Sequence, residues 1–146
     1  MMAWDLDNTL IHTREANLRA YMSLGVTPPQ NFHRIHWSEW TTTAAHEEKG
    51  RIIGKFLSQF AEITPMFSIY TQVGGPILTA TSDQVLQFIR SAWPIFTAAH
   101  IIRCATPDQK VAALQSISPG VYVDDDQYTI DLVRKQTAWK AALVTF

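Results

Sequence analysis

Five short apolar runs recur along the chain, each about five residues long, and most contain β-branched residues. They lie at residues 2–6, 76–80, 100–104, 121–124 and 141–145. A run of this length that is apolar at nearly every position is typical of a strand buried on both faces. The hydrophobic pattern therefore predicts five strands in a parallel sheet.

Helical patterns fill most of the intervals between these runs. Thr64-Pro65 and Thr106-Pro107 each place a capping hydroxyl before a proline at the first helical position. Ser82 or Asp83 can cap a helix that follows the second run, and residues 127–137 form the pattern of a last crossover helix. The alternation predicts an α/β fold with a Rossmann-like, three-layer parallel sheet.

Residues 14–64 interrupt the alternation, because they contain no convincing strand. Apolar and aromatic residues recur there at helical spacing, at His33, His36, Trp37 and Trp40 and again at Ile52, Ile53, Phe56, Leu57 and Phe60. We expect two or three helices that form a small cap. The predicted domains are therefore a core of residues 1–13 and 65–146 and a helical insertion of residues 14–64.

Composition narrows the class of protein. The 146 residues are 47% hydrophobic with a formal net charge of -1, which fits one domain with a small insertion and argues against long nucleic acid as a partner. Cys104 is the only cysteine, and no apolar run reaches the roughly 20 residues that a membrane span needs. Asp5 lies too early for a secretory signal. We expect a cytoplasmic protein that does not span a membrane.

Polar residues gather where the predicted strands end. Asp5 and Asp7 follow the first strand, Thr79 lies at the end of the second, and Lys110 is in the first turn after Thr106-Pro107. Three acids, Asp124, Asp125 and Asp126, follow the fourth. Ligands of open α/β sheets bind at the carboxyl edge of the strands, so these side chains are candidates for one site. In extended chain Asp5 and Asp7 would share a face and repel each other unless a cation lay between them.

These residues, in this order, resemble the four motifs of the haloacid dehalogenase-like (HAD) hydrolases: Asp5-Leu-Asp7-Asn-Thr9, then Thr79, Lys110 and Asp124-Asp125. The resemblance implies a Mg²⁺-dependent phosphomonoester hydrolase that forms an aspartyl-phosphate. It implies that Asp5 is nucleophile and metal ligand, and that the Asp7 carbonyl binds the metal while its carboxyl acts as acid and base. It also implies that Thr79 holds phosphoryl oxygens and that Lys110 offsets negative charge.

The last motif leaves its register open. The family usually has a further acid about four residues after the metal ligand, but Thr129 stands there if Asp125 is that ligand. Asp125 is our first choice for the metal, Asp124 the second and Asp126 the third. Each of these acids alone also fits an ordinary solvated loop.

The substrate is open as well. The resemblance and the balanced charge favour a small phosphorylated metabolite, with a nucleotide or polynucleotide-end phosphatase as the alternative, or a phosphomutase or phosphotransferase of the same fold. Basic residues of the insertion are candidates to contact a remote group of the substrate, namely Arg14, Arg34, Lys49, Arg51 and Lys55. The sequence does not indicate an oligomeric state.

Overall fold

The computed structural model describes all 146 residues, which form two compact units. The first unit comprises Met1–His12, Ile63–Thr81 and Ala98–Phe146, and the second comprises Thr13–Glu62 and Ser82–Thr97. We expected an insertion over residues 14–64, and in the structure Ser82–Thr97 groups with that stretch. The chain therefore leaves the first unit twice.

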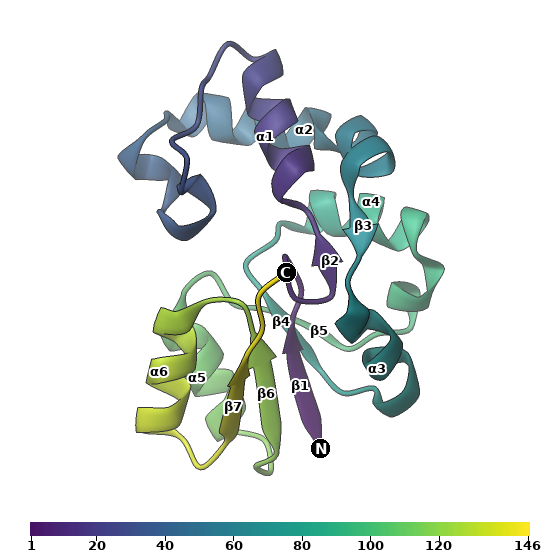
Figure 1. Cartoon of the computed structure of the whole chain (residues 1–146), viewed down its shortest axis with the longest axis vertical. Coiled ribbons are helices and arrows are strands. Elements are labelled where there is room, and N and C mark those ends of the chain that lie inside the picture. Colours follow the sequence, from purple (N-terminus) through teal and green to yellow (C-terminus); the bar gives the residue numbers. More distant parts are fainter. The chain divides into compact units, whose positions relative to one another are not determined.

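A five-stranded parallel sheet lies at the centre of the first unit (Figure 1). Its strand order is β5-β4-β1-β6-β7, and all neighbouring strands are parallel. The strands are β1 (Met2–Asp5), β4 (Ile77–Thr79), β5 (Ile101–Arg103), β6 (Val121–Asp124) and β7 (Lys140–Leu143). All five lie where the apolar runs predicted them, so the α/β fold class is confirmed.

Three helices accompany the sheet in this unit: α3 (Pro65–Val73), α5 (Pro107–Gln115) and α6 (Gln127–Gln136). A side-chain oxygen caps each N-terminus, supplied by Thr64, Thr106 and Asp126. The two Thr-Pro pairs act as predicted, because the hydroxyl accepts from a backbone N–H and the proline has no N–H to satisfy.

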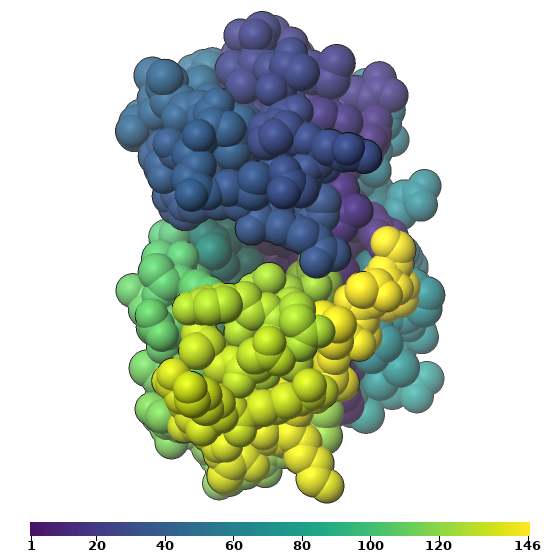
Figure 2. Space-filling model, turned by 60° about the vertical axis from the view of Figure 1, so that its left-hand side comes forward, coloured from purple at the N-terminus to yellow at the C-terminus, as the bar shows by residue number.

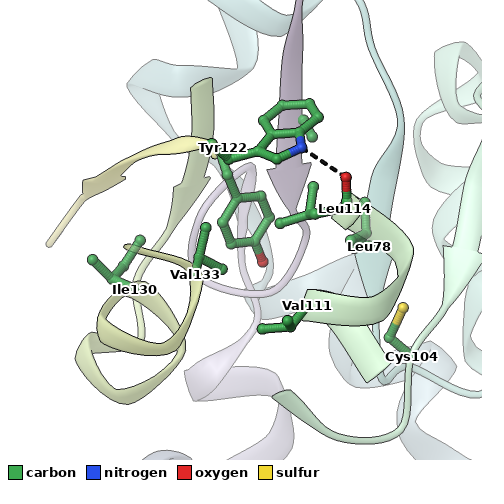
Figure 3. Packing of buried hydrophobic residues seen from close by; sticks show 9 residues of the cluster. Leu78, Cys104, Val111, Leu114, Tyr122, Ile130 and Val133 are labelled. Atoms are coloured by element: carbon green, nitrogen blue, oxygen red, sulfur yellow. Dashed lines mark hydrogen bonds between the residues drawn. The ribbon is translucent and has the colours of Figure 1, made fainter. Parts of the chain in front are cut away.

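A hydrophobic core lies between the sheet and helices α5 and α6 (Figure 3). Tyr122 and Leu78 from the sheet meet Val111 and Leu114 of α5 and Val133 of α6. Trp139 joins them, and its Nε1–H donates to the Leu114 carbonyl at 2.8 Å. Burying large apolar side chains of this kind stabilises the fold by about 1.5–3 kcal/mol each.

The alternation of side chains along β1 places Trp4 on the face opposite Ala3. Ala3 belongs to the core with α5 and α6, whereas the Trp4 ring contacts the Tyr70 ring of α3 edge-on at 6.0 Å. Trp4 Nε1–H donates to the Gly74 carbonyl at 2.9 Å. Both faces of the central strand are therefore covered.

The second unit contains three α-helices: α1 (Arg14–Ser23), α2 (Thr43–Phe60) and α4 (Asp83–Ala92). Helix α2 packs against both of the others. It approaches α4 closely at Gly54, where a Cβ would lie 2.6 Å from the Phe88 ring. A short 3₁₀-helix, η3 (Pro94–Thr97), follows α4.

The helical face predicted through His33, His36, Trp37 and Trp40 is wrong. This stretch forms two 3₁₀ turns, η1 (Phe32–Arg34) and η2 (Trp37–Glu39), with His36 extended between them at φ -60° and ψ 137°. The ring of His36 accepts a hydrogen bond from the Ser38 N–H, a local contact that competes with helix formation. The aromatic spacing instead reflects contacts with two different helices, because Trp37 stacks on His46 of α2 and Trp40 packs on Tyr21 of α1.

A second, two-stranded sheet was not predicted. It pairs β2 (Ile11–His12) with β3 (Glu62–Ile63). The Thr64 N–H donates to the Leu10 carbonyl at 2.9 Å beside it. Strands of two residues leave no alternation in the sequence, so hydrophobic periodicity does not detect them.

The surface of the first unit includes α6 and the C-terminal strand, shown in yellow-green and yellow in Figure 2. A shallow pocket near α6 is lined by residues that include Leu114, Ile117, Pro119 and Trp139 and contains no carboxylate, histidine or cysteine. The candidate chemistry therefore does not lie there. No helix of the chain is long and apolar enough to cross a membrane.

Candidate active site

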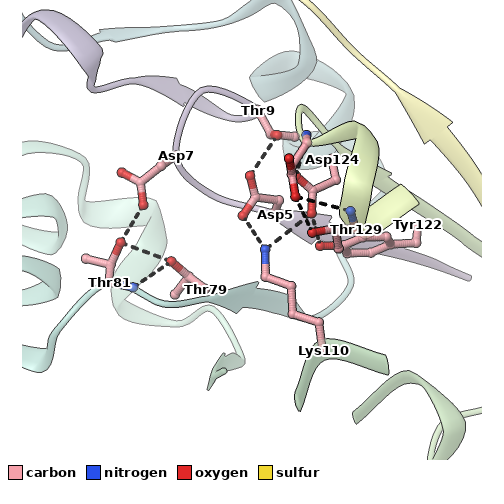
Figure 4. Close-up of polar contacts among 10 residues, drawn as sticks. Asp5, Asp7, Thr9, Thr79, Thr81, Lys110, Tyr122, Asp124 and Thr129 are labelled. Atoms are coloured by element: carbon pink, nitrogen blue, oxygen red, sulfur yellow. Dashed lines mark hydrogen bonds and ion pairs between the residues drawn. The ribbon is translucent and has the colours of Figure 1, made fainter. Parts of the chain in front are cut away.

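The candidate site lies at the carboxyl ends of three adjacent strands, β4, β1 and β6 (Figure 4). Strand β1 ends at Asp5, β4 at Thr79 and β6 at Asp124. Lys110 reaches the same place from the first turn of α5. Parallel pairing brings these residues together although up to 119 positions separate them in the sequence.

Lys110 connects two of the acids. Its Nζ lies 2.8 Å from Asp5 Oδ1 and 3.2 Å from Asp124 Oδ2. All three residues are buried, with 9%, 6% and 1% of their surfaces exposed, respectively. At this burial, solvent screens the pairs weakly, so each charge depends on the others for stabilisation.

The turn after β1 orients Asp5. The Leu6 carbonyl accepts from the N–H groups of Leu10 and Ile11, and Asn8 has a left-handed φ of 61°. Asn adopts this conformation at lower cost than most residues. The turn brings Thr9 back beside Asp5, where its hydroxyl donates to Asp5 Oδ2 at 3.0 Å. Both oxygens of Asp5 are thus held.

The turn separates the two carboxylates that the sequence predicted on one face. Strand β1 ends at Asp5, so the extended geometry does not continue to Asp7. Asp7 points toward Thr81, whose hydroxyl donates to Asp7 Oδ2, while Asp5 points toward Lys110 (Figure 4). The expectation of a shared direction is wrong for this reason.

Thr79 and Thr81 form a chain of hydrogen bonds that ends at Asp7. The Thr79 hydroxyl donates to Thr81 Oγ1 at 3.0 Å and accepts from the Thr81 N–H at 3.1 Å. Thr79 is 1% exposed. In this structure its hydroxyl is bonded to Thr81, and it orients the threonine that contacts Asp7.

The three consecutive acids at the end of β6, Asp124, Asp125 and Asp126, have different environments. Asp126 caps α6 and accepts from the N–H and hydroxyl of Thr129. Asp124 accepts from Lys110 and the Tyr122 hydroxyl at Oδ2, and from the Asp126 N–H at Oδ1. Asp125 lies between them in sequence, partly exposed. These contacts give Asp126 a structural role that accounts for its presence.

Burial and like charge both act on the carboxyl groups. Burial raises the pKa of Asp5 well above its usual value, and Asp124 raises it further, although Lys110 opposes this. Burial likewise raises the pKa of Asp125 to about 6. A cation that bound here would stabilise the ionised forms of both.

Two further groups of the site keep their protons at neutral pH. Burial works to lower the pKa of Lys110, but Asp5, Tyr122 and Asp124 outweigh it and hold that pKa well above its usual value. Burial raises the pKa of Tyr122, so its hydroxyl remains a donor to Asp124. The site thus contains one permanent cation against several carboxylates.

A divalent metal ion fits this donor set. One carboxylate oxygen each from Asp5, Asp124 and Asp125 lie within 4.8 Å of one another. Hard cations such as Mg²⁺ take oxygen ligands and commonly one or two carboxylates, and they would relieve the excess of negative charge. The residues present therefore match the expected cofactor.

Solved structures resemble this chain throughout its length. CbbY from Rhodobacter sphaeroides, in complex with phosphate, is 17% identical with a TM-score of 0.72, and the match covers 99% of this chain and 85% of CbbY. A HAD-superfamily hydrolase of subfamily IA from Geobacter sulfurreducens is 14% identical, with a TM-score of 0.66 over 97% of this chain and 85% of that one. The chain has the HAD-like fold.

Other comparisons add to this. A protein assigned as a phosphoglycolate phosphatase, from Lactobacillus plantarum, is 12% identical with a TM-score of 0.70, covering 97% of this chain and 84% of that one. No protein-family model and no curated protein matches the sequence. The resemblance to HAD hydrolases that the motifs predicted is confirmed in the fold.

Within the HAD-like fold, sequence reasoning missed three contacts of the site. Thr9 belongs to the motif Asp5-Leu-Asp7-Asn-Thr9, but no role was predicted for it. Neither Thr81 nor Tyr122 was predicted to lie in the site. Thr81 lies two residues after Thr79, and Tyr122 lies two before Asp124, so each shares a strand-end neighbourhood with a candidate. This two-residue spacing from Thr79 and from Asp124 is the feature of the sequence that could have identified them. The side-chain contacts themselves depend on the turns.

Proposed function

We propose that this protein is a Mg²⁺-dependent phosphomonoester hydrolase with Asp5 as its nucleophile. The observation that carries the proposal is the buried cluster in which Lys110 pairs with Asp5 and Asp124 beside Asp125. A phosphate monoester is anionic, so a carboxylate attacks it only where positive charge offsets both groups. A cluster of acids around one lysine at a strand edge suits that requirement.

Asp5 and Asp125 would hold the metal ion together with the backbone carbonyl of Asp7. Asp124 is the second choice of carboxylate, because it is 1% exposed and already accepts from Lys110, Tyr122 and the Asp126 N–H, whereas Asp125 is partly exposed. When bound, Mg²⁺ would offset the negative charge of the phosphate and the nucleophile and orient the phosphoryl group.

In the first half of the reaction, an oxygen of Asp5 attacks phosphorus and the bond from phosphorus to the ester oxygen breaks. The Asp7 carboxyl gives its proton to the leaving oxygen, which departs as an alcohol. Lys110 offsets charge beside Asp5, and Thr9 keeps the carboxylate oriented. An aspartyl-phosphate remains on Asp5.

In the second half, Asp7 takes a proton from a water that attacks phosphorus, and the bond from phosphorus to Asp5 breaks. Inorganic phosphate leaves and Asp5 is a free carboxylate again. Because Thr81 donates to Asp7, this hydroxyl would position the acid and base. Thr79 would hold phosphoryl oxygens only after its hydroxyl turns from Thr81.

Small phosphorylated metabolites are the substrate class that we propose. An Asp-to-Asn variant of CbbY, a structure of the same fold, was solved in complex with xylulose-(1,5)bisphosphate. The balanced net charge of -1 supports a small substrate over long nucleic acid.

The experiment is phosphate release from a panel of sugar phosphates, nucleotides and a chromogenic ester, with Mg²⁺ or with chelator. We expect activity that requires Mg²⁺ and that falls by at least about 10³-fold in Asp5→Asn. Asp131→Asn, on the exposed side of α6, is the matched control and should retain full activity. No release by folded, Mg²⁺-loaded wild type would contradict the proposal.

The same panel detects the two alternatives. Transfer to an organic acceptor would yield a rearranged or new phosphate ester without free phosphate, as a phosphomutase or phosphotransferase does. Selective release from nucleotides or from polynucleotide ends would assign the substrate to that class instead.

A further inference from the structure

The second unit contains buried polar groups that nothing in the chain satisfies. Nε of Arg14, Nδ1 of His33 and Nε1 of Trp40 are buried without a hydrogen-bond partner. Buried polar groups in folded proteins are almost always hydrogen-bonded. These three atoms can be satisfied only from outside the chain, by solvent or by the acceptor atoms of a ligand.

Contacts with the Phe32 ring connect His33 and Trp40. The Phe32 ring lies 5.7 Å from the His33 ring and 6.0 Å from the Trp40 ring. Trp40 packs against Tyr21 at 4.8 Å, and Tyr21 lies seven residues after Arg14, on the same face of α1. About two helical turns separate Arg14 from Tyr21, but the charge of Arg14 lowers the pKa of His33, so the unsatisfied atoms belong to one neighbourhood within the second unit.

This neighbourhood has positive charge without a counter-charge. Neither Arg14 nor Arg34 forms an ion pair. Glu15 pairs with Arg19 at 2.7 Å and Glu48 pairs with Arg51 at 2.7 Å, and no carboxylate is among the charges that shift the pKa of His33. Two guanidinium groups are therefore available for a negative partner.

The hydrogen bond between Arg34 and His33 identifies the proton on the histidine. Arg34 Nε donates to His33 Nε2 at 3.3 Å, and a guanidinium cannot accept. Burial lowers the pKa of His33, and the charges of Arg14 and Arg34 lower it further, so the ring is neutral at pH 7. The remaining proton then lies on Nδ1. All three unsatisfied atoms are N–H donors.

We propose that Arg14, His33, Arg34 and Trp40 form a binding site for an oxyanion, a carboxylate or phosphate group. The guanidinium groups match the planar geometry of such a group, and the histidine and indole N–H groups supply further donors. Arg14, His33 and Trp40 are each only partly buried, and Arg34 is exposed, so an anion can approach from solvent. The site lies wholly in the second unit and does not depend on the proposed hydrolysis.

Inorganic phosphate is the probe for this site. In metal-free, ¹⁵N-labelled protein we expect saturable shifts of the Trp40 indole N–H and Arg14 Nε–H signals on phosphate addition. Arg14→Gln should weaken phosphate binding about tenfold or more, since it removes a charged donor. Arg19→Gln removes an equal charge from an exposed pair on the same helix and should leave binding unchanged.

Absence of saturable shifts, or equal affinities in folded Arg14→Gln and Arg19→Gln, would overturn the site. Trp40→Phe gives an independent test, because it retains a ring while removing the indole donor. It should also weaken phosphate binding, and an unchanged affinity would remove Trp40 from the site.

Hydrolysis kinetics then distinguish whether the bound anion is a group of the substrate or a free anion. Only this experiment rests on the proposed function. A rise in KM of about tenfold in Arg14→Gln, confined to phosphomonoesters with a second acidic group and with kcat retained, assigns the site to the substrate. Weakened phosphate binding with unchanged KM for every ester assigns it to a free anion. Failure of all hydrolysis would refute the proposed function while the phosphate titration still decides the site.

Discussion

Lys110 is the residue on which the candidate site most depends, because it forms ion pairs with two buried carboxylates. It lies 2.8 Å from Asp5 and 3.2 Å from Asp124. Removing one partner of a buried ion pair leaves the other charge without compensation, which costs more than the pair itself contributes.

We therefore predict that Lys110→Met lowers the free energy of unfolding by about 3 kcal/mol at pH 8 in the absence of metal. Urea denaturation measures this, with Lys135→Met, an exposed position on α6, as the control. Mg²⁺ should restore part of the loss, since it supplies positive charge to the same acids. Equal losses of unfolding free energy in the two variants would show that the ion pairs of Lys110 do not stabilise the fold.

The sequence predicted that Asp5, Thr79, Lys110 and Asp124 lie near one another, because three of them end predicted strands and Lys110 is in the first turn of a predicted helix. It also predicted Asp7 on the same face as Asp5, which is wrong. The direction of Asp7 depends on where β1 ends and on how the next turn bends, and neither has a periodic signal.

Among the elements, the turn after β1 does the most to arrange the site. It brings the Thr9 hydroxyl onto Asp5 and turns Asp7 toward Thr81. Asn8 makes the turn possible with its left-handed φ of 61°. A β-branched residue is strained in that conformation.

Asn8→Val is predicted to lower the free energy of unfolding by about 1–2 kcal/mol, whereas Asn8→Gly should cost less, because glycine adopts this conformation without strain. Thermal and urea unfolding of both variants give the comparison. If valine were tolerated as well as glycine, the left-handed turn would not be the native one.

The segment around η1 and η2 shows where element prediction fails. Its aromatic spacing matches a helix, yet Trp37 stacks on His46 and Trp40 packs on Tyr21, so two partners on different helices produce the pattern. Periodicity in one sequence does not distinguish one helical face from contacts with two neighbours.

For the whole molecule, the raised carboxyl pKa values connect metal binding to stability. The pKa of Asp125 is about 6 in the folded protein, against an ordinary value of 3.8, so the folded state binds this proton more tightly than the unfolded chain does. Asp125 therefore contributes stability to the metal-free protein that is lost as pH rises from about 4 to about 6.

The expected loss from Asp125 is at most about 3 kcal/mol, at about 1.4 kcal/mol per pKa unit. Asp125→Asn should remove most of this pH dependence and also much of the stabilisation by Mg²⁺ above pH 6. Melting curves from pH 4 to pH 8, with and without Mg²⁺, measure both effects, and Asp131→Asn is the control. An unchanged pH profile in Asp125→Asn would exclude this carboxyl as the source.

The division of the chain was only partly predictable. The insertion predicted over residues 14–64 was detectable because it interrupts the alternation of strands and helices. Ser82–Thr97 was not, since it follows β4 just as a crossover helix would. It groups with the second unit through contacts such as that of Phe88 with Gly54, which the order of elements does not encode.

In the proposed reaction Asp5 becomes phosphorylated and the aspartyl-phosphate is then hydrolysed. Rapid quenching during turnover of a labelled phosphomonoester with Mg²⁺, followed by peptide mapping of the wild type and Asp5→Asn, tests this step. We predict transient label on the peptide that contains Asp5, lost as inorganic phosphate appears, and no label in Asp5→Asn. Release of phosphate at an unchanged rate by Asp5→Asn, or label on a different residue, would contradict this reaction.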